Sequence, residues 1–155
     1  MASDDTHIIC FGNELHGDDG VGPAVHALLA ATALPPGVRL MRADLAGLAA
    51  IACFDDCRRA VMVDALRGFG APGSIHELDA LPLANEASVD EAASGFHGAG
   101  VGALLRLLPV ALEHLPEIRL IGIEIESTTP FTPGLSAPVA GSIATAARMV
   151  MEQLA

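Results

Sequence analysis

Two carboxylates and one imidazole stand where an α/β protein usually carries its ligands. Asp19 lies in a glycine-rich loop after the first apolar segment, and Asp64 directly follows the apolar run 60–63. His97 lies between Phe96 and a Gly-Ala-Gly segment, just before a helical pattern. Carboxylate and imidazole groups suit borderline divalent metals such as nickel or zinc. We therefore predict that Asp19, Asp64 and His97 together form a metal-binding site.

Each of these residues also has a purely structural explanation. Asp19, like its neighbour Asp18, could cap the following helix by accepting backbone N–H groups. Asp64 could bind a neighbouring loop, although a carboxylate on a buried strand end is costly unless a cation or several N–H donors meet it. A lone histidine such as His97 is more often structural than a ligand. The residue types alone leave these alternatives open.

The loop 12–22 reads Gly-Asn-Glu-Leu-His-Gly-Asp-Asp-Gly-Val-Gly and favours a cation over a phosphate. It lacks both the G-x-G-x-x-G spacing and the lysine of a P-loop, and its three carboxylates would repel an anion. We interpret His16 and Asp18 as loop-shaping or substrate-rim residues. The cysteines belong to the packing, because no second pair completes a four-ligand metal clip; they are Cys10, Cys53 and Cys57.

Strand and helix patterns alternate along the chain. Strands are predicted at residues 7–12, 38–43, 59–66, 74–78 and 119–126, helices at 21–32, 45–54, 101–112 and 139–154, and a loop at 81–94. Ser136 is the expected N-cap of the last helix, with Pro138 in its first turn. The order predicts βαβ connections around a mainly parallel sheet with 59–66 in the middle. Ligands of such sheets bind at the carboxyl ends of the strands, where Asp19 and Asp64 fall.

Composition and charge narrow the class of protein. The 155 residues fit one domain, spanning residues 1–155. Because 8 Lys and Arg face 19 Asp and Glu, the net charge of −11 makes nucleic acid an unsuitable partner. The N-terminus has no signal-peptide pattern and no apolar run reaches about 18 residues, so we expect a cytoplasmic protein without a membrane partner. Three cysteines agree with a reducing compartment, and self-association stays open.

The loop 12–22 resembles the G-N-x-L-x-x-D-D/E-x-x-G signature of the hydrogenase maturation protease family. Further family landmarks follow in order and spacing, and nearly the whole chain is covered: Val-Asp-Ala-Leu at 63–66, Ala-Pro-Gly at 71–73, Ser-Gly-Phe-His at 94–97 and the strand at 120–127. The chain departs from the family at Cys10, where a G-x-G-N run usually begins, and at Asp19, where many members carry Glu.

The resemblance implies a three-layer α/β fold, in which helices flank a mostly parallel five-stranded sheet. It also implies an aspartic-type endopeptidase that removes the C-terminal extension of a nickel-loaded hydrogenase large-subunit precursor. In the family, the side chains that match Asp19, Asp64 and His97 bind the nickel already seated in the precursor. The expected partner is therefore that precursor, which supplies the nickel, and the same three residues are the expected catalytic and metal-binding groups.

Two other functions remain compatible with the residues. A nickel-dependent chaperone could check metal loading of the hydrogenase large subunit with the same three ligands and cut nothing. A small-ligand-binding α/β domain is disfavoured by the missing phosphate motif and by the acidic charge. Within the peptidase hypothesis, the sequence offers no competing nucleophile, because it has neither a G-x-S-x-G elbow nor a loop cysteine paired with histidine.

Overall fold

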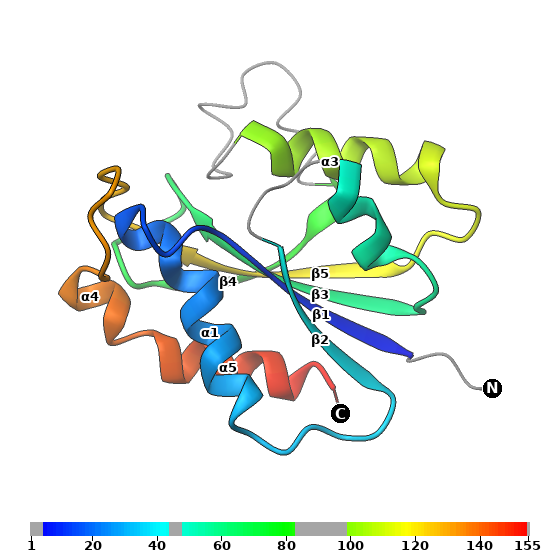
Figure 1. Cartoon of the computed structure of the whole chain (residues 1–155), viewed down its shortest axis with the longest axis horizontal. Helices are drawn as coiled ribbons and strands as arrows, with labels where there is room; N and C mark the ends of the chain where they lie inside the picture. The colour runs from blue at the N-terminus through cyan, green and yellow to red at the C-terminus, as the bar shows by residue number, and fades with distance from the viewer. Residues whose placement is uncertain (1–4, 44–47, 83–98, 155) are drawn as a thin grey trace.

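The computed structural model describes residues 5–43, 48–82 and 99–154. In this part of the chain a five-stranded sheet lies between two helical layers (Figure 1). The strands are β1 (Thr6–Phe11), β2 (Val38–Ala43), β3 (Arg59–Leu66), β4 (Ile75–Asp79) and β5 (Glu117–Glu124). The helices are η1 (Gly17–Gly20), α1 (Val21–Ala30), η2 (Leu48–Phe54), α3 (Ala99–Ala111), α4 (Ala137–Ala140) and α5 (Ile143–Glu152), where η marks a 3-10 helix. The three-layer α/β architecture is confirmed.

The sheet has the strand order β2-β1-β3-β5-β4. All neighbouring strands run parallel except β4, which is antiparallel to β5 and lies at the edge. β3 occupies the middle, as its unbroken run of apolar residues predicts for a strand covered on both faces. The register pairs Cys10 with Val63 and Asp64 with Gly122, so the carboxyl ends of β1, β3 and β5 lie together at one end of the sheet.

Alternating side chains of the strands divide the core into two apolar clusters. Met62 and Leu66 of β3 face the cluster that η2 and α3 cover, and Val61 and Val63 face the one that α1 and α5 cover. Figure 1 shows η2 and α3 on one side of the sheet and α1, α4 and α5 on the other. By this alternation Asp64, between Val63 and Ala65, projects toward the α3 side.

Three predicted helical or loop segments differ from the structure. The segment predicted as a helix at 45–54 forms the 3-10 helix η2 over its described part. The last helix is divided in two at Gly141 and Ser142, which separate α4 from α5. Of the predicted loop 81–94, only Leu81 and Pro82 are described, and both are helical. Among the described residues, no helix has the length and apolar character that a bilayer crossing requires.

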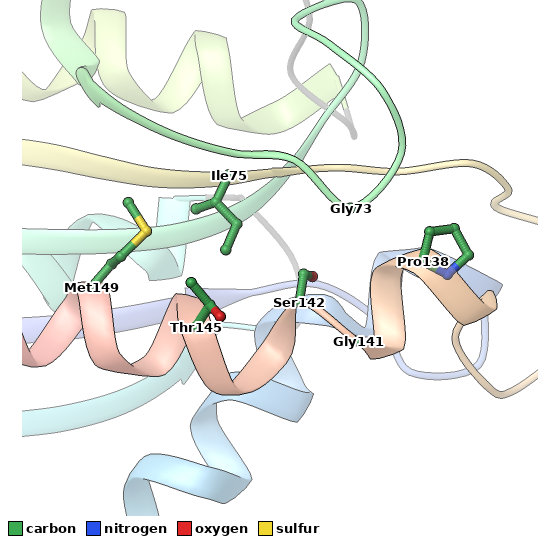
Figure 2. A pocket seen from close by; sticks show the side chains of 7 residues that line it. All are labelled: Gly73, Ile75, Pro138, Gly141, Ser142, Thr145 and Met149. Atoms are coloured by element: carbon green, nitrogen blue, oxygen red, sulfur yellow. The ribbon is translucent and has the colours of Figure 1, made fainter.

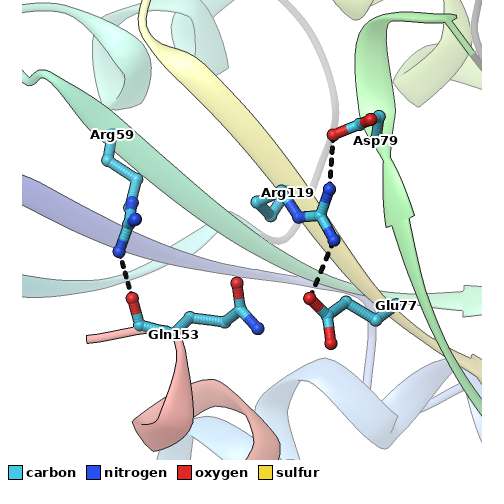
Figure 3. Close-up of polar contacts among 5 residues, drawn as sticks. All are labelled: Arg59, Glu77, Asp79, Arg119 and Gln153. Carbon is cyan, nitrogen blue, oxygen red and sulfur yellow. Dashed lines mark hydrogen bonds and ion pairs between the residues drawn. The ribbon is translucent and has the colours of Figure 1, made fainter. Parts of the chain in front are cut away.

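Polar contacts near the amino end of β5 fasten the sheet at a distance from the carboxyl ends of the parallel strands. Arg119 donates to Glu77 at 2.8 Å and to Asp79 at 2.6 Å, which joins β5 to the edge strand β4 (Figure 3). Arg59 at the start of β3 donates to the backbone carbonyl of Gln153, beyond α5. These contacts are partly exposed and contribute little to stability, and they lie away from the carboxyl ends of the parallel strands.

Candidate functional site

Asp64 is a buried carboxylate with an unsatisfied oxygen. Asp64 is 1% exposed, and within residues 5–43, 48–82 and 99–154 its Oδ1 accepts a single hydrogen bond, from the N–H of the adjoining Ala65 at 2.8 Å. Oδ2 has no hydrogen-bond partner among the described residues. Burial raises the pKa of Asp64 well above its ordinary value, the Ala65 N–H partly offsets this, and the nearby charge of Asp19 raises the pKa further. Such an oxygen is costly in its charged form unless a cation or N–H donors meet it.

The turn after β1 brings Asp19 toward Asp64. Gly12 begins this turn with φ +139°, and a Cβ there would lie 2.0 Å from the backbone oxygen of Asp19. Asn13 shapes the turn twice, since its Oδ1 accepts the N–H of Leu15 and its own N–H donates to Asp19 Oδ2, both at 2.9 Å. Asp19 therefore accepts a hydrogen bond from the loop before it through Oδ2.

Asp18 has a different role from its neighbour, because its carboxylate joins two distant segments. It is 1% exposed and accepts the N–H groups of Glu126 at 2.9 Å, of Ser127 at 3.0 Å and of Ser136 at 2.7 Å. The Ser136 hydroxyl donates a fourth bond, at 2.8 Å. Burial alone would raise the pKa of Asp18, but these hydrogen bonds outweigh it and lower the pKa. The proposed helix-capping role of Asp18 is wrong.

Ser136 occupies the N-cap position of α4 as predicted, but its side chain does not cap the helix. Its hydroxyl donates to Asp18 instead, so the start of α4 is fastened to the turn that carries Asp19. The sequence shows the cap position through Pro138 and the following apolar residues. It gives no sign of the long-range partner.

His97 lies outside the described residues, so its position relative to the two carboxylates stays a prediction. The helix α3 starts at Ala99 and covers the face of the sheet toward which Asp64 projects. Within residues 5–43, 48–82 and 99–154, no three His, Cys, Asp or Glu side chains are grouped so as to hold a metal. The described part of the chain thus supplies two neighbouring carboxylates, Asp19 and Asp64, of the predicted set.

Glu124 is a buried polar residue whose structural role no motif in the sequence indicates. It ends β5 beside Leu66, is 4% exposed, and accepts the N–H groups of the loop after β3, namely Gly68 at 3.0 Å, Phe69 at 2.7 Å and Gly70 at 3.2 Å. All of its oxygens are thereby engaged with backbone donors. Glu124 stiffens the rim of the site and is no candidate ligand.

The cysteines behave as packing residues, as predicted. Burial raises the pKa of Cys10 to about 12. Burial also raises the pKa of Cys57 to about 11, although a hydrogen bond from the backbone of His7 opposes this rise. A thiol that stays protonated at neutral pH is a poor nucleophile and a poor metal ligand. His7 is likewise structural, because its Nδ1 lies 2.8 Å from the backbone oxygen of Cys53.

A hollow of about 420 Å³ opens elsewhere, between the start of β4 and the helices α4 and α5 (Figure 2). Ile75, Thr145 and Met149 line it, with four further residues labelled in the figure. None of the lining residues carries a carboxylate, imidazole or thiol. It therefore lacks the groups needed for acid–base or metal chemistry, in contrast to the carboxyl end of β3.

A family model covers most of the chain. Residues 23–153 match the model named HycI, described as hydrogenase maturation protease. No protein in the curated set matches the chain significantly.

Solved structures match nearly the full length. A hydrogenase 2 maturation peptidase from a Thaumarchaeota archaeon is 29% identical, with a TM-score of 0.70, covering 96% of this chain and 97% of that one. The hydrogenase maturating endopeptidase HybD of Escherichia coli is 22% identical, with a TM-score of 0.82 and coverage of 96% and 91%. HybD of Thermococcus kodakarensis is 24% identical, with a TM-score of 0.75 and coverage of 97% and 98%.

Proposed function

Because the chain belongs to the hydrogenase maturation protease family, we propose that it is an endopeptidase acting on a hydrogenase large-subunit precursor that already carries nickel. The enzyme removes the C-terminal extension of that precursor by cleaving one peptide bond. Asp19, Asp64 and His97 bind the substrate's nickel, and the protein acts in the cytoplasm as one domain over residues 1–155.

The observation that carries this proposal is the Oδ2 of buried Asp64, which has no hydrogen-bond partner in the part of the chain that the structure describes. Burial at a strand end disfavours the charged form of a carboxylate, and the neighbouring Asp19 disfavours it further. A divalent cation reverses both effects, because it attracts the two negative charges and occupies the empty coordination position. Carboxylates with an imidazole form a donor set that nickel accepts. A metal-bearing substrate would thus offset the cost of burying the charged carboxylate of Asp64.

The residues contribute binding and orientation. With the nickel held in the precursor, Asp19 and Asp64 grip the precursor at a defined point, so that the bond to be cleaved stays beside the site. The metal supplies Lewis acidity toward the scissile carbonyl. The Gly12 and Asn13 turn keeps Asp19 in place, and the Asp18 hydrogen bonds keep that turn rigid.

A processing assay tests the proposal. Purified protein is mixed with nickel-loaded precursor, and mass spectrometry detects the released C-terminal peptide. We expect release by the wild type and at least a tenfold loss for Asp64→Asn and for His97→Ala, with unchanged circular dichroism. Asp79→Asn and His114→Ala are the matched controls, because Asp79 lies near the amino end of β5 and His114 is exposed after α3. Normal processing by His97→Ala would contradict the assigned site.

The chaperone alternative predicts a different result in the same assay. A protein that only checks nickel loading would bind the loaded precursor and release no peptide, however long the incubation. Binding and cleavage are therefore measured together, with precursor lacking nickel as the second control. The peptidase hypothesis requires that the nickel-free precursor is not cut.

A further inference from the structure

We propose that Phe131, together with Leu15 of the bridged loop, is the docking contact by which this protein recognises the hydrogenase large-subunit precursor and sets its affinity. This inference rests on the proposed function and extends it to the surface around the metal-binding turn. The partner side is an apolar patch of the precursor next to its nickel.

Phe131 is an exposed aromatic residue in an unfavourable backbone conformation. Its side chain is 82% exposed, and its φ of +57° lies in the left-handed region that side chains other than glycine seldom adopt. Neither burial nor a relaxed backbone accounts for a phenylalanine at this place. Strain combined with exposure is typical of residues kept for binding rather than for stability.

The segment around Phe131 is held firmly despite its exposure. His16 and Thr132 form a parallel backbone bridge, in which Gly17 donates to Thr132 at 2.9 Å. The ring of Phe131 lies 5.8 Å from the ring of His16, measured between centroids. Asp18 fastens both ends of the segment through Ser127 and Ser136. A rigid exposed aromatic loses little conformational freedom on binding, which favours affinity.

The same bridge connects Phe131 to the metal-binding turn. The two bridged segments run parallel. Leu15 therefore occupies the position before His16 in one segment, and Phe131 occupies the equivalent position before Thr132 in the other. Leu15 is 50% exposed, and the backbone carbonyl of His16 accepts the N–H of Asp19 at 3.1 Å. The apolar contact is thus continuous with the turn that carries the proposed nickel ligand. Leu15 and Asp19 belong to the same loop, and the bridge joins the segment of Phe131 to it.

Steady-state processing of nickel-loaded precursor tests the docking role. We expect Phe131→Ser to raise KM at least tenfold and to leave kcat within twofold, because the residue contacts the partner and not the scissile bond. Leu15→Ser should raise KM by a smaller factor. Val110→Ser is the matched control: it is 85% exposed near the end of α3, on the opposite side of the view from the 127–136 segment (Figure 1). Its KM should equal that of the wild type.

Phe131→Gly separates docking from a structural role. Glycine adopts positive φ readily, so this variant should melt within a few degrees of the wild type while its KM rises as in Phe131→Ser. An unchanged KM in both Phe131 variants overturns the proposal. Calorimetric binding of the nickel-loaded precursor distinguishes failure of the docking proposal from failure of the peptidase function. If the wild type binds the precursor but does not cleave it, the peptidase function is wrong. Docking through Phe131 is then tested by whether Phe131→Ser lowers the affinity. If the wild type does not bind, docking is wrong.

Discussion

Asp18 and Ser136 are joined by two hydrogen bonds, from the backbone N–H to Oδ1 at 2.7 Å and from the hydroxyl to Oδ2 at 2.8 Å. The two residues are 118 positions apart in the sequence. Through this pair, the turn after β1 and the segment leading into α4 form one rigid rim. Asp18 therefore holds the rim, whereas its neighbour Asp19 is the residue that we propose as a metal ligand.

Replacing aspartate by asparagine should affect stability at Asp18 and processing at Asp19. Asp18→Asn places an amide N–H₂ among groups that all donate, so it should lower the free energy of unfolding by about 2–3 kcal/mol. We expect Asp19→Asn to keep the fold, because Asp19 is partly exposed and an amide oxygen can still accept the N–H of Asn13. Denaturant unfolding and precursor processing are measured on both variants. Asp19→Asn should lose processing at nearly wild-type stability; equal unfolding of the two variants would contradict this division.

Acid should remove the Asp18 contribution. Its folded pKa is lowered, so the stabilisation is fully present above the unfolded value of about 3.9 and is lost as pH falls through the folded value. The difference in melting temperature between wild type and Asp18→Asn should therefore be large at pH 7 and shrink below about pH 4. A difference that stays constant across this range would mean that the charge of Asp18 is unimportant.

Asp64 should show the reverse dependence on pH. Its folded pKa is raised, so the folded state binds the proton more tightly and the wild type loses stability as pH rises above the unfolded value of about 3.9. Asp64→Asn removes this penalty and should melt at or above the wild-type temperature at pH 7, with the advantage vanishing in acid. Processing should nevertheless fall at least tenfold, roughly as expected for a lost ligand contact. Unfolding of Asp64→Asn at pH 7 would contradict the metal-binding assignment.

Gly12 should be less replaceable than Gly37, another glycine with a positive φ. Gly12→Ala adds backbone strain and pushes its Cβ against the Asp19 carbonyl, for a combined cost of about 3 kcal/mol and impaired processing. Gly37→Ala is the matched control, because Gly37 has φ +81° but no atom within 4 Å of the added Cβ. Its cost should be about 1 kcal/mol, from strain alone, with normal processing. Thermal unfolding and the processing assay measure both.

The isolated protein should hold no tightly bound resident metal. A site that receives the substrate's nickel must keep coordination positions open, and open sites with few protein ligands bind free metal weakly. Elemental analysis of protein purified without added metal should show well under one equivalent. A full equivalent of zinc that survives a chelator would contradict this. Added Ni²⁺ should bind wild type weakly and Asp64→Asn more weakly still.

The regular elements could be predicted from the sequence because their signals are local. The bounds of β2 and β3 agree to the residue with the predicted strands, since a Pro-Pro-Gly turn precedes one and a continuous apolar run marks the other. η1 is missed because four residues with two glycines carry no periodicity. The break between α4 and α5 is missed because Gly141 falls within an otherwise regular apolar pattern.

The candidate site was predictable in part, for the same reason. Asp64 is recognisable because a charge at the end of an apolar strand is unusual in any sequence. The hydrogen bonds of Asp18 and Glu124 are not recognisable, since their donors lie 54 to 118 residues away. The exposure of Phe131 depends on a backbone turn that no pattern in the segment specifies. Long-range polar contacts are set by the folded topology rather than by neighbouring residues.

The strand order also determines when the site can form during folding. β3 lies between β1, synthesised about 50 residues earlier, and β5, synthesised about 55 residues later, so its two ladders must close long loops. All four donors to Asp18 come from residues 126–136, near the end of the chain. Until those residues are made, the carboxylate of Asp18 lacks these partners. The turn that carries Asp19 is thus synthesised about 110 residues before the segment that fixes it.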